Sequence, residues 1–392
     1  MLDCMENNGK RLEVGIFSPG NLRIGAGVEN LIYNLVMSKP ENVNITIIQT
    51  EYLPYERLEQ TRLKEISEKA KLITIKLLLP TQINAIKNLP STLQFFLYQL
   101  YMRVYFNLTY FRRNKKLFSN FDIVYLTNNW FYPIFIGKKL VGTQHTDFDY
   151  LPSKSGLKQL IKIRLISAGV LFNRISAFHL FPASRKISNA IKGGNNLILE
   201  SGVNLLNYTI CRKSGKPIFL FVGRLEECKG VKFILELWDK YKIDYELNVV
   251  GIGPLYSLKP DDDECQKVNF KGILNERELR ELYSRSDILL SPTKCDTYSM
   301  TITQALASGC HVLVSDFLNG MFDIYSDAGY LHYLPLKHSL WVKKIEFIAT
   351  NINEIRKNAT MVRQLAAETN DIKKISQKLF TFLENISTQN IS

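Results

Sequence analysis

Residues 217–254 read PIFLFVGRLEECKGVKFILELWDKYKIDYELNVVGIGP, and the stretch alternates two kinds of pattern. The apolar run Ile218–Val222 is typical of a buried strand, and Tyr245–Val250 is a second run of the same kind. Between them, residues 231–240 space their apolar side chains as a helix does. A strand, a helix and a second strand make a βαβ unit, which implies a parallel sheet covered by helices.

The same alternation continues on both sides of this stretch. Downstream, it predicts strands at 268–271, 288–291 and 311–315 and helices at 276–284 and 301–308. Upstream, it predicts strands at 12–18, 44–48, 121–126 and 140–144, a helix at 29–37, helical character over 56–71 and a basic helix at 157–178.

Two α/β domains therefore account for the 392 residues, a length that suits two domains better than one. Polar residues and Gly215 break the apolar pattern near 205–216, so the junction is placed there. We assign 1–208 to an N-terminal domain, 209–375 to a C-terminal domain and 376–392 to a C-terminal helix that returns to the first domain.

The charge of the chain is uneven. The net charge is +13, and residues 1–205 hold 26 Lys+Arg against 14 Asp+Glu, whereas the rest holds 24 against 23. A basic half indicates an anionic partner, such as an acidic acceptor or an anionic membrane surface. Nucleic acid is a poorer explanation because no recognised nucleic-acid-binding module is present.

The cysteines and the N-terminus bear on the compartment. None of the six cysteines stands in a C-x-x-C spacing, which gives no signal for a zinc ribbon or a thioredoxin motif. Residues 1–13 are polar and carry acids, unlike a secretory signal. We expect a cytoplasmic protein with reduced thiols.

Residues 93–111 are strongly apolar and aromatic but contain Arg103 and several amides, which argues against a bilayer span. Clustered bases follow at 112–116. Two interpretations stay open: a helix at the inner face of a membrane, or a packed helix with a solvated basic edge.

Charged residues and glycines follow the strands of the second half. Arg224 comes directly after one strand, and Lys229 precedes a helix, so the two cations could clamp a diphosphate. Gly251 and Gly253 follow the next strand, where glycines permit close approach of a ligand to the backbone. The N–H groups of Ser299 and Met300, before another helix, could add anion binding.

These segments together resemble a known family. Phe221-Val-Gly-Arg-Leu-Glu-Glu-Cys-Lys-Gly230 looks like the Gly-Arg…Lys-Gly signature of the retaining glycosyltransferases of family four (glycosyl transferases group 1). Asn248–Pro254, Val268–Gly272 and Ser286–Pro292 resemble the segments that follow in that family. Asp296–Gly309 resembles its E-x7-E element, so the match is ordered over about residues 217–320.

The first half resembles the family more weakly. Gly25-Ala-Gly-Val-Glu29 looks like the G-G-x-E loop, and Gly142–Asp147 looks like the strand end with the active-site histidine. Glu200–Asn204 resembles the turn before the domain crossover. The resemblance implies the GT-B fold: two facing, doubly wound Rossmann-like α/β domains with a central cleft.

The resemblance also implies roles. Arg224 and Lys229 would hold the diphosphate of a nucleotide-sugar donor and stabilise the leaving group. Asp296 and Gln304 stand at the two acids of E-x7-E, near the sugar and the ribose. The implied site is catalytic His145, Arg224, Lys229 and Asp296 with donor-binding Gly25, Gly27, Gly223, Gly251, Gly253, Gly272, Ser299, Met300 and Gln304.

This chain departs from the family pattern at both acids. Asp296 is one methylene shorter than glutamate, and Gln304 is uncharged, although an amide can both accept from and donate to ribose hydroxyls. Thr297 and Ser299 stand where the family has glycines, and their side chains could narrow the sugar pocket.

The function that follows is a retaining hexosyltransferase that moves a sugar from a nucleotide-diphosphate donor to a glycan or lipid-linked acceptor. Two alternatives remain: a degenerate, non-catalytic binding subunit, and a GT-B nucleotide-sugar epimerase. We expect no cofactor and no required metal, because Asp147/Asp149 and Asp261–Asp263 satisfy D-x-D without a second ligand cluster.

Overall fold

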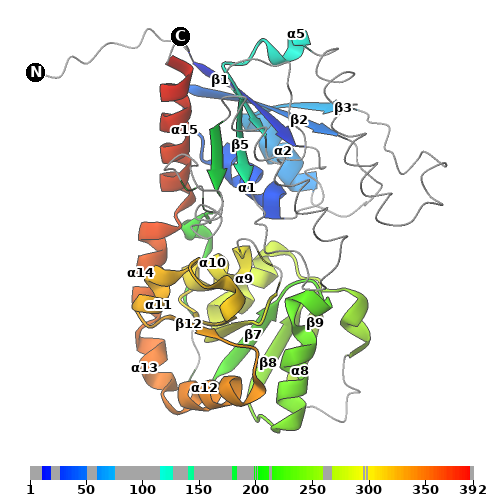
Figure 1. Cartoon of the computed structure of the whole chain (residues 1–392), viewed down its shortest axis with the longest axis vertical. Coiled ribbons are helices and arrows are strands. Elements are labelled where there is room, and N and C mark those ends of the chain that lie inside the picture. The colour runs from blue at the N-terminus through cyan, green and yellow to red at the C-terminus, as the bar shows by residue number, and fades with distance from the viewer. Residues whose placement is uncertain are drawn as a thin grey trace, which may run out of the picture. The chain divides into compact units, whose positions relative to one another are not determined.

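The computed structural model describes residues 11–18, 27–50, 60–75, 115–126, 140–144, 179–182, 198, 200, 202–211, 214–258, 267–294, 296 and 299–388. Contacts divide the chain into two compact units. The first unit comprises Met1–Ala183, Ile187–Leu199 and Lys373–Ser392, and the second comprises Ser184–Lys186 and Glu200–Ile372. Each unit holds one parallel sheet (Figure 1).

The sheet of the first unit has the strand order β3-β2-β1-β4-β5-β6, and all neighbours run parallel. Its strands are β1 (Leu12–Ser18), β2 (Val43–Thr50), β3 (Lys71–Ile75), β4 (Ile123–Leu126), β5 (Leu140–Gln144) and β6 (His179–Pro182). Its described helices are α1 (Gly27–Met37), α2 (Gln60–Lys69), α5 (Lys115–Phe118) and α15 (Ile372–Thr388).

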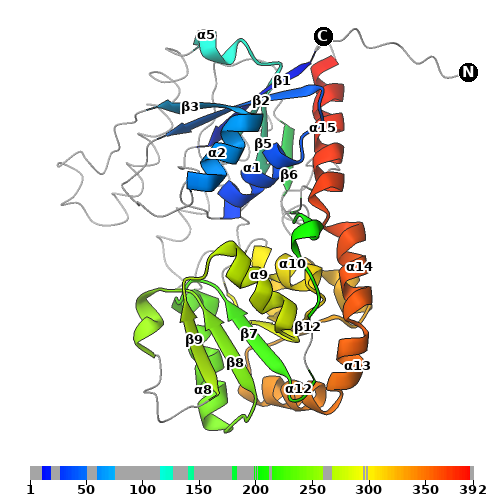
Figure 2. The same ribbon diagram turned by 180° about the vertical axis from the view of Figure 1, so that it is seen from behind.

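The C-terminal helix α15 packs into the first unit. Leu379, Phe380 and Leu383 on this helix are each 1% exposed. The Ser376 hydroxyl donates to the carbonyl oxygen of Ser38 at 3.0 Å. Figure 2 shows α15 running along this unit near α1. A segment from the end of the chain thus completes the core that β1, β2 and α1 begin.

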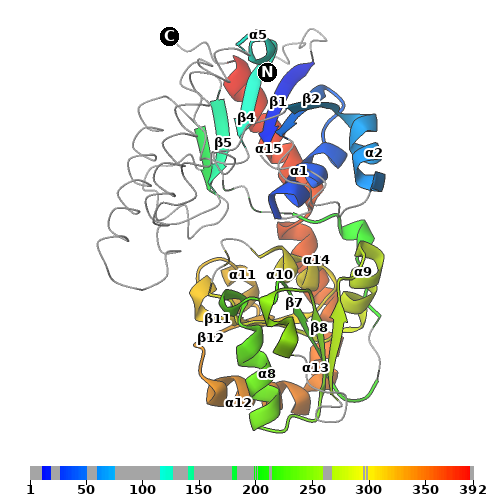
Figure 3. The same cartoon turned by 90° about the vertical axis from the view of Figure 1, so that its right-hand side faces the viewer.

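The sheet of the second unit has the order β12-β11-β10-β7-β8-β9 and is also parallel throughout (Figure 3). Its strands are β7 (Ile218–Val222), β8 (Glu246–Val250), β9 (Val268–Gly272), β10 (Ile288–Ser291), β11 (His311–Ser315) and β12 (Leu331–Leu334). Its α-helices are α8 (Val231–Lys240), α9 (Glu276–Arg285), α10 (Met300–Ala307), α11 (Asp323–Asp327), α12 (His338–Thr350), α13 (Ile352–Lys357) and α14 (Ala359–Thr369).

Helices cover both faces of this second sheet. On one face, Trp238 of α8 and Trp341 of α12 pack with the strand residues Phe219 and Leu247. On the other face, apolar residues of α9, α10, α11 and α14 pack with alternate strand residues such as Leu220. The central strands β7, β10 and β11 are apolar on both sides because both of their faces are covered, which explains their continuous apolar runs in the sequence.

The strands and helices predicted around residues 217–315 are confirmed within one or two residues. The edge strands β3, β6 and β12 were not predicted. The helical expectation for 56–71 is wrong at its end, because α2 stops at Lys69 and β-branched residues take over in β3. Segments 93–111 and 157–178 lie outside the described residues.

Candidate functional site

The loops after β7, β8 and β9 lie side by side at the carboxyl edge of the second sheet. The Gly223 N–H donates to the Val250 carbonyl at 3.1 Å, and the Gly251 N–H donates to the Gly272 carbonyl at 2.8 Å. β10 lies on the other side of β7, so the connections leave β7 and β10 in opposite directions. Open parallel sheets bind ligands at such a switch point.

Lys229 and Asp296 meet at this switch point. The Lys229 ammonium forms an ion pair with the Asp296 carboxylate, and the two side chains are only 19% and 18% exposed. Lys229 ends the 3-10 helix η6 (Glu227–Lys229), whereas Asp296 lies in the loop after β10. The structure thus brings together two of the predicted catalytic side chains and pairs the cation with a carboxylate.

The two loops that carry this pair are held together by their backbones. The Lys294 N–H donates to the Cys228 carbonyl at 2.7 Å. Gly230 has φ +77°, and a Cβ there would lie 2.4 Å from the Pro292 carbonyl oxygen. Only glycine fits this position, so Gly230, directly after Lys229, is needed for the loops to meet.

Arg224 is placed differently from Lys229. Its side chain is 68% exposed, and its guanidinium donates to the Glu226 carboxylate at 2.8 Å. An exposed pair of this kind is weak, because water competes with it. Arg224 can therefore turn toward an anion at the same edge with little loss of stability.

Gly251 and Gly253 face the protein's own backbone. Gly251 has φ +131°, and a Cβ there would lie 1.9 Å from the Gly223 carbonyl oxygen. A Cβ on Gly253 would lie 2.5 Å from the Leu225 carbonyl oxygen. Close packing between the β7 and β8 loops explains both glycines without a ligand, and their assignment to the donor site stays a prediction.

Helix α10 begins at the same edge, directly after the Asp296 loop. Ser299 is its N-cap residue and is 3% exposed, and its hydroxyl contacts the Thr301 hydroxyl at 2.9 Å without capping the helix. The first N–H groups of a helix need acceptors, and its dipole favours an anion there. Ser299 and Met300 thus stand where the sequence predicted an anion-binding helix start.

Gln304 lies one turn further along α10 and contacts a residue that sequence reasoning missed. The Tyr283 hydroxyl of α9 donates to the Gln304 side-chain oxygen at 3.3 Å. Tyr283 is 0% exposed, and burial raises the pKa of its phenol well above the usual value. The available signal was a tyrosine on the apolar face of a helix, since a buried tyrosine hydroxyl needs a hydrogen-bond partner.

The remaining predicted residues belong to the first unit. Gly27 is the first residue of α1, after β1. Gly25 and His145 lie outside the described residues, so the roles of these three residues stay predictions. The acids of the two D-x-D segments, Asp147, Asp149 and Asp261–Asp263, also lie outside them.

Two features are absent from the part of the chain that the structure describes. No group of three or more His, Cys, Asp or Glu side chains in these residues is arranged to hold a metal ion. No helix within them is long and apolar enough to cross a membrane.

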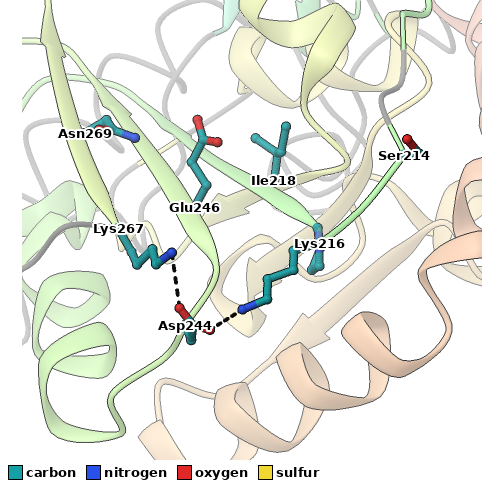
Figure 4. Close-up of a pocket in the computed structure, with 8 residues that line it drawn as sticks. Ser214, Lys216, Ile218, Asp244, Glu246, Lys267 and Asn269 are labelled. Atoms are coloured by element: carbon teal, nitrogen blue, oxygen red, sulfur yellow. Dashed lines mark hydrogen bonds and ion pairs between the residues drawn. The ribbon is translucent and has the colours of Figure 1, made fainter.

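A polar pocket of about 410 Å³ lies at the amino ends of the strands of the second sheet, opposite to the candidate site (Figure 4). Ile218 and Glu246, the first residues of β7 and β8, line it. Asp244 pairs there with Lys216 and Lys267, and the hydrogen bond from Lys216 lowers the Asp244 pKa most. None of the predicted site residues lines this pocket, so it is separate from the candidate site.

One cysteine contradicts the expected thiol state. Cys228, next to Lys229, is disulfide-bonded. Cys211 and Cys310 are free. The expectation of reduced thiols is therefore wrong for Cys228, because a cysteine spacing without a motif does not reveal pairs that form only in the folded chain.

Residues 210–385 match the family described as Glycosyl transferases group 1. A GDP-mannose-dependent alpha-mannosyltransferase of Corynebacterium glutamicum is 35% identical over 98 residues, which cover 24% of this chain and 22% of the relative. The curated relatives that match are covered over only 22–51% of their own length.

Solved structures match over far more of the chain. Sucrose-phosphate synthase from Thermosynechococcus elongatus has a TM-score of 0.70 at 14% identity, covering 96% of this chain and 99% of that one. HepE of Anabaena in complex with UDP has a TM-score of 0.68 at 14% identity, covering 95% and 100%. At such low identity, the likeness shows the fold alone. The chain therefore has the α/β GT-B fold, and its residues 210–385 match the glycosyl transferases group 1 family.

Proposed function

We propose that this protein transfers a sugar from a nucleotide-diphosphate donor to a glycan or lipid-linked acceptor. The observation that carries the proposal is the half-buried Lys229 at the switch point of the second sheet, beside the exposed Arg224 and the start of α10. The oxygens of a diphosphate could replace the Asp296 carboxylate as the partner of the Lys229 ammonium. The UDP bound by HepE and the GDP-mannose dependence of the mannosyltransferase support a nucleotide donor.

In the proposed mechanism, Lys229 and Arg224 neutralise the charge that grows on the leaving diphosphate. Charge stabilisation of this kind commonly contributes more to catalysis than any other effect. Asp296, freed from Lys229, would contact the sugar hydroxyls, and His145 would stand near the transferred sugar. The leaving diphosphate would take the acceptor proton, and the transfer would retain the anomeric configuration. We further propose that no metal ion is needed, since two side-chain cations can carry the charge.

We assign the binding of donor and acceptor to different domains, with the domain bounds 1–208, 209–375 and 376–392. The C-terminal domain would bind the donor, and the basic N-terminal domain would bind the acceptor and an anionic membrane surface on the cytoplasmic side. Binding to vesicles of anionic and of neutral lipids tests the membrane contact. Stronger binding to anionic vesicles that weakens with salt supports it, and equal binding to both contradicts it.

Direct binding tests the donor site. Calorimetric titration with a panel of UDP and GDP sugars in the presence of EDTA should find at least one ligand. Lys229→Ala and Arg224→Ala should each weaken its binding, with the larger loss at the less exposed Lys229. The matched control is Lys232→Ala, which removes an exposed lysine on α8 whose nearest acid, Glu236, is 3.9 Å away. Binding that needs a divalent ion, or that survives both variants, contradicts the proposal.

A degenerate, non-catalytic subunit remains the second candidate because Gln304 replaces an acid of the family pattern. Gln304→Glu distinguishes the two candidates. A variant that gains turnover indicates a weakened enzyme. No turnover in either form, together with intact donor binding, indicates a binding subunit. The epimerase alternative predicts conversion of the nucleotide sugar itself without any acceptor.

A further inference from the structure

The side-chain amide of Gln304 is held at one end only. Its oxygen accepts a hydrogen bond from the Tyr283 hydroxyl, with 3.3 Å between the two oxygens. Its nitrogen has no hydrogen-bond partner among the described residues, and Gln304 is half-buried within α10. One end of the amide is therefore used inside the protein, and the other end is available to a ligand.

The buried tyrosine decides which end that is. Tyr283 is fully buried, and its raised pKa keeps the phenol protonated at neutral pH, so its O–H group needs an acceptor. An amide oxygen accepts, whereas an amide nitrogen only donates. If the amide turned around, its N–H group would face the phenol and the proton of the phenol would lose this acceptor.

We propose that Tyr283 is a positioning residue that fixes the Gln304 amide with its N–H groups toward the donor ribose. This inference rests on the proposed donor site. A carboxylate at position 304 could only accept hydrogen bonds, so it would bind the hydrogen of a ribose hydroxyl. The oriented glutamine instead donates to the hydroxyl oxygen. The ribose contact thus has the opposite hydrogen-bond polarity to the one an acid gives.

Ribose analogues separate the two polarities. A methyl ether keeps the oxygen that accepts but loses the hydrogen that donates, and a deoxy sugar loses both. UDP and GDP are titrated first, and the one that binds is compared with its 2′- and 3′-O-methyl and deoxy analogues. At the contacted hydroxyl, the wild type should bind the O-methyl form within about threefold of the parent and the deoxy form about tenfold or more weakly.

The Gln304→Glu variant should reverse this pattern. It should bind the unmodified diphosphate but lose about tenfold or more on O-methylation, because the carboxylate then faces an ether oxygen without a hydrogen. A wild type that rejects O-methyl and deoxy forms equally at both positions overturns the inference while leaving donor binding intact. Failure of UDP and GDP to bind the wild type would instead count against the proposed function.

A double-mutant cycle tests the part played by Tyr283. Tyr283→Phe should weaken diphosphate binding several-fold in the wild type and have no further effect in Gln304→Ala, because the tyrosine acts through the amide. The control is Tyr325→Phe, which removes another buried hydroxyl from the same apolar cluster. An equal loss from Tyr283→Phe in both backgrounds, or an equal loss from Tyr325→Phe, would assign Tyr283 a structural role only.

Discussion

At the residue scale, the pairing of Lys229 with Asp296 is central to the proposed chemistry. Both groups are largely shielded from water, so either charge would be poorly solvated without an ionic partner. A bound diphosphate would replace the carboxylate as the partner of the ammonium. The carboxylate would then become available to sugar hydroxyls, so donor binding and exposure of Asp296 would be coupled.

Asp296→Asn should separate the two roles of this pair. Without its carboxylate partner, Lys229 is free, so the nucleoside diphosphate should bind as tightly as in the wild type or up to about tenfold more tightly. Sugar transfer should fall, because the amide is a poorer acceptor for sugar hydroxyls. Titration and turnover measured on the same preparation check both expectations. Weaker diphosphate binding in Asp296→Asn would show that the pair does not compete with the ligand.

Asp287 provides a second residue-scale prediction, on stability. It is 2% exposed, accepts from the Ile218 N–H at 3.0 Å and forms a two-pronged pair with Arg356, with both N–O distances 2.9 Å. Arg356→Ala would leave this buried carboxylate without its cation and should destabilise the second unit by about 3–5 kcal/mol. Urea unfolding measures the change, with the highly exposed Arg277→Ala as the control. A loss no larger than that of the control would contradict the assigned role.

At the element scale, the loops after β7 and β8 contain glycines that pack closely on neighbouring backbone. Gly251→Ala should lower the free energy of unfolding by more than about 2 kcal/mol, because it combines a positive φ with a 1.9 Å approach to the Gly223 carbonyl oxygen. Gly320→Ala is the matched control, since it has φ +84° but nothing within 4 Å of its Cβ. The control should lose only about 1 kcal/mol. Equal losses would show that the close approach adds nothing to the cost of the positive φ.

Strand β12 gives a prediction on pH. Burial, together with the nearby charge of Lys344, lowers the pKa of His332 from 6.5 to about 4. Between pH 4 and 6.5 the unfolded chain therefore binds a proton that the folded chain does not. Stability should rise as pH increases through this window, and His332→Gln should flatten that part of the profile. If the free energy of unfolding of His332→Gln changed with pH as that of the wild type does, His332 would not be the cause of this pH dependence.

The elements show what could be predicted from the pattern and what could not. Strands β7, β8, β10 and β11 are buried on both faces, so their apolar runs predicted them. A short edge strand such as Leu331–Leu334 was missed because its four residues, with a histidine and a tyrosine between two leucines, form neither an apolar run nor a regular alternation. The strand-end positions of Arg224 and Lys229 followed from the same pattern. The pattern could not predict the contacts Lys229–Asp296 and Tyr283–Gln304, because each joins residues that are far apart in sequence.

At the scale of the whole molecule, the GT-B fold follows from the sheets and the solved structures, and the match to the glycosyl transferases group 1 family covers residues 210–385. The sequence resemblance predicted both from ordered motifs over about residues 217–320. It also led us to expect a C-terminal helix over 376–392 that returns to the first domain, and in the structure α15 packs into the first unit through Leu379 and Phe380. The donor, the acceptor and the stereochemical outcome are proposals, because side-chain chemistry in the loops sets them and the fold does not.

Proton NMR of a nucleotide sugar incubated with the wild type and with Lys229→Ala, without added metal, would examine sugar transfer itself. We expect slow release of the nucleoside diphosphate, a first sugar product with the anomeric configuration of the donor, and loss of this release in the variant. Release with the inverted configuration, or release that Lys229→Ala leaves unchanged, would contradict the proposed mechanism.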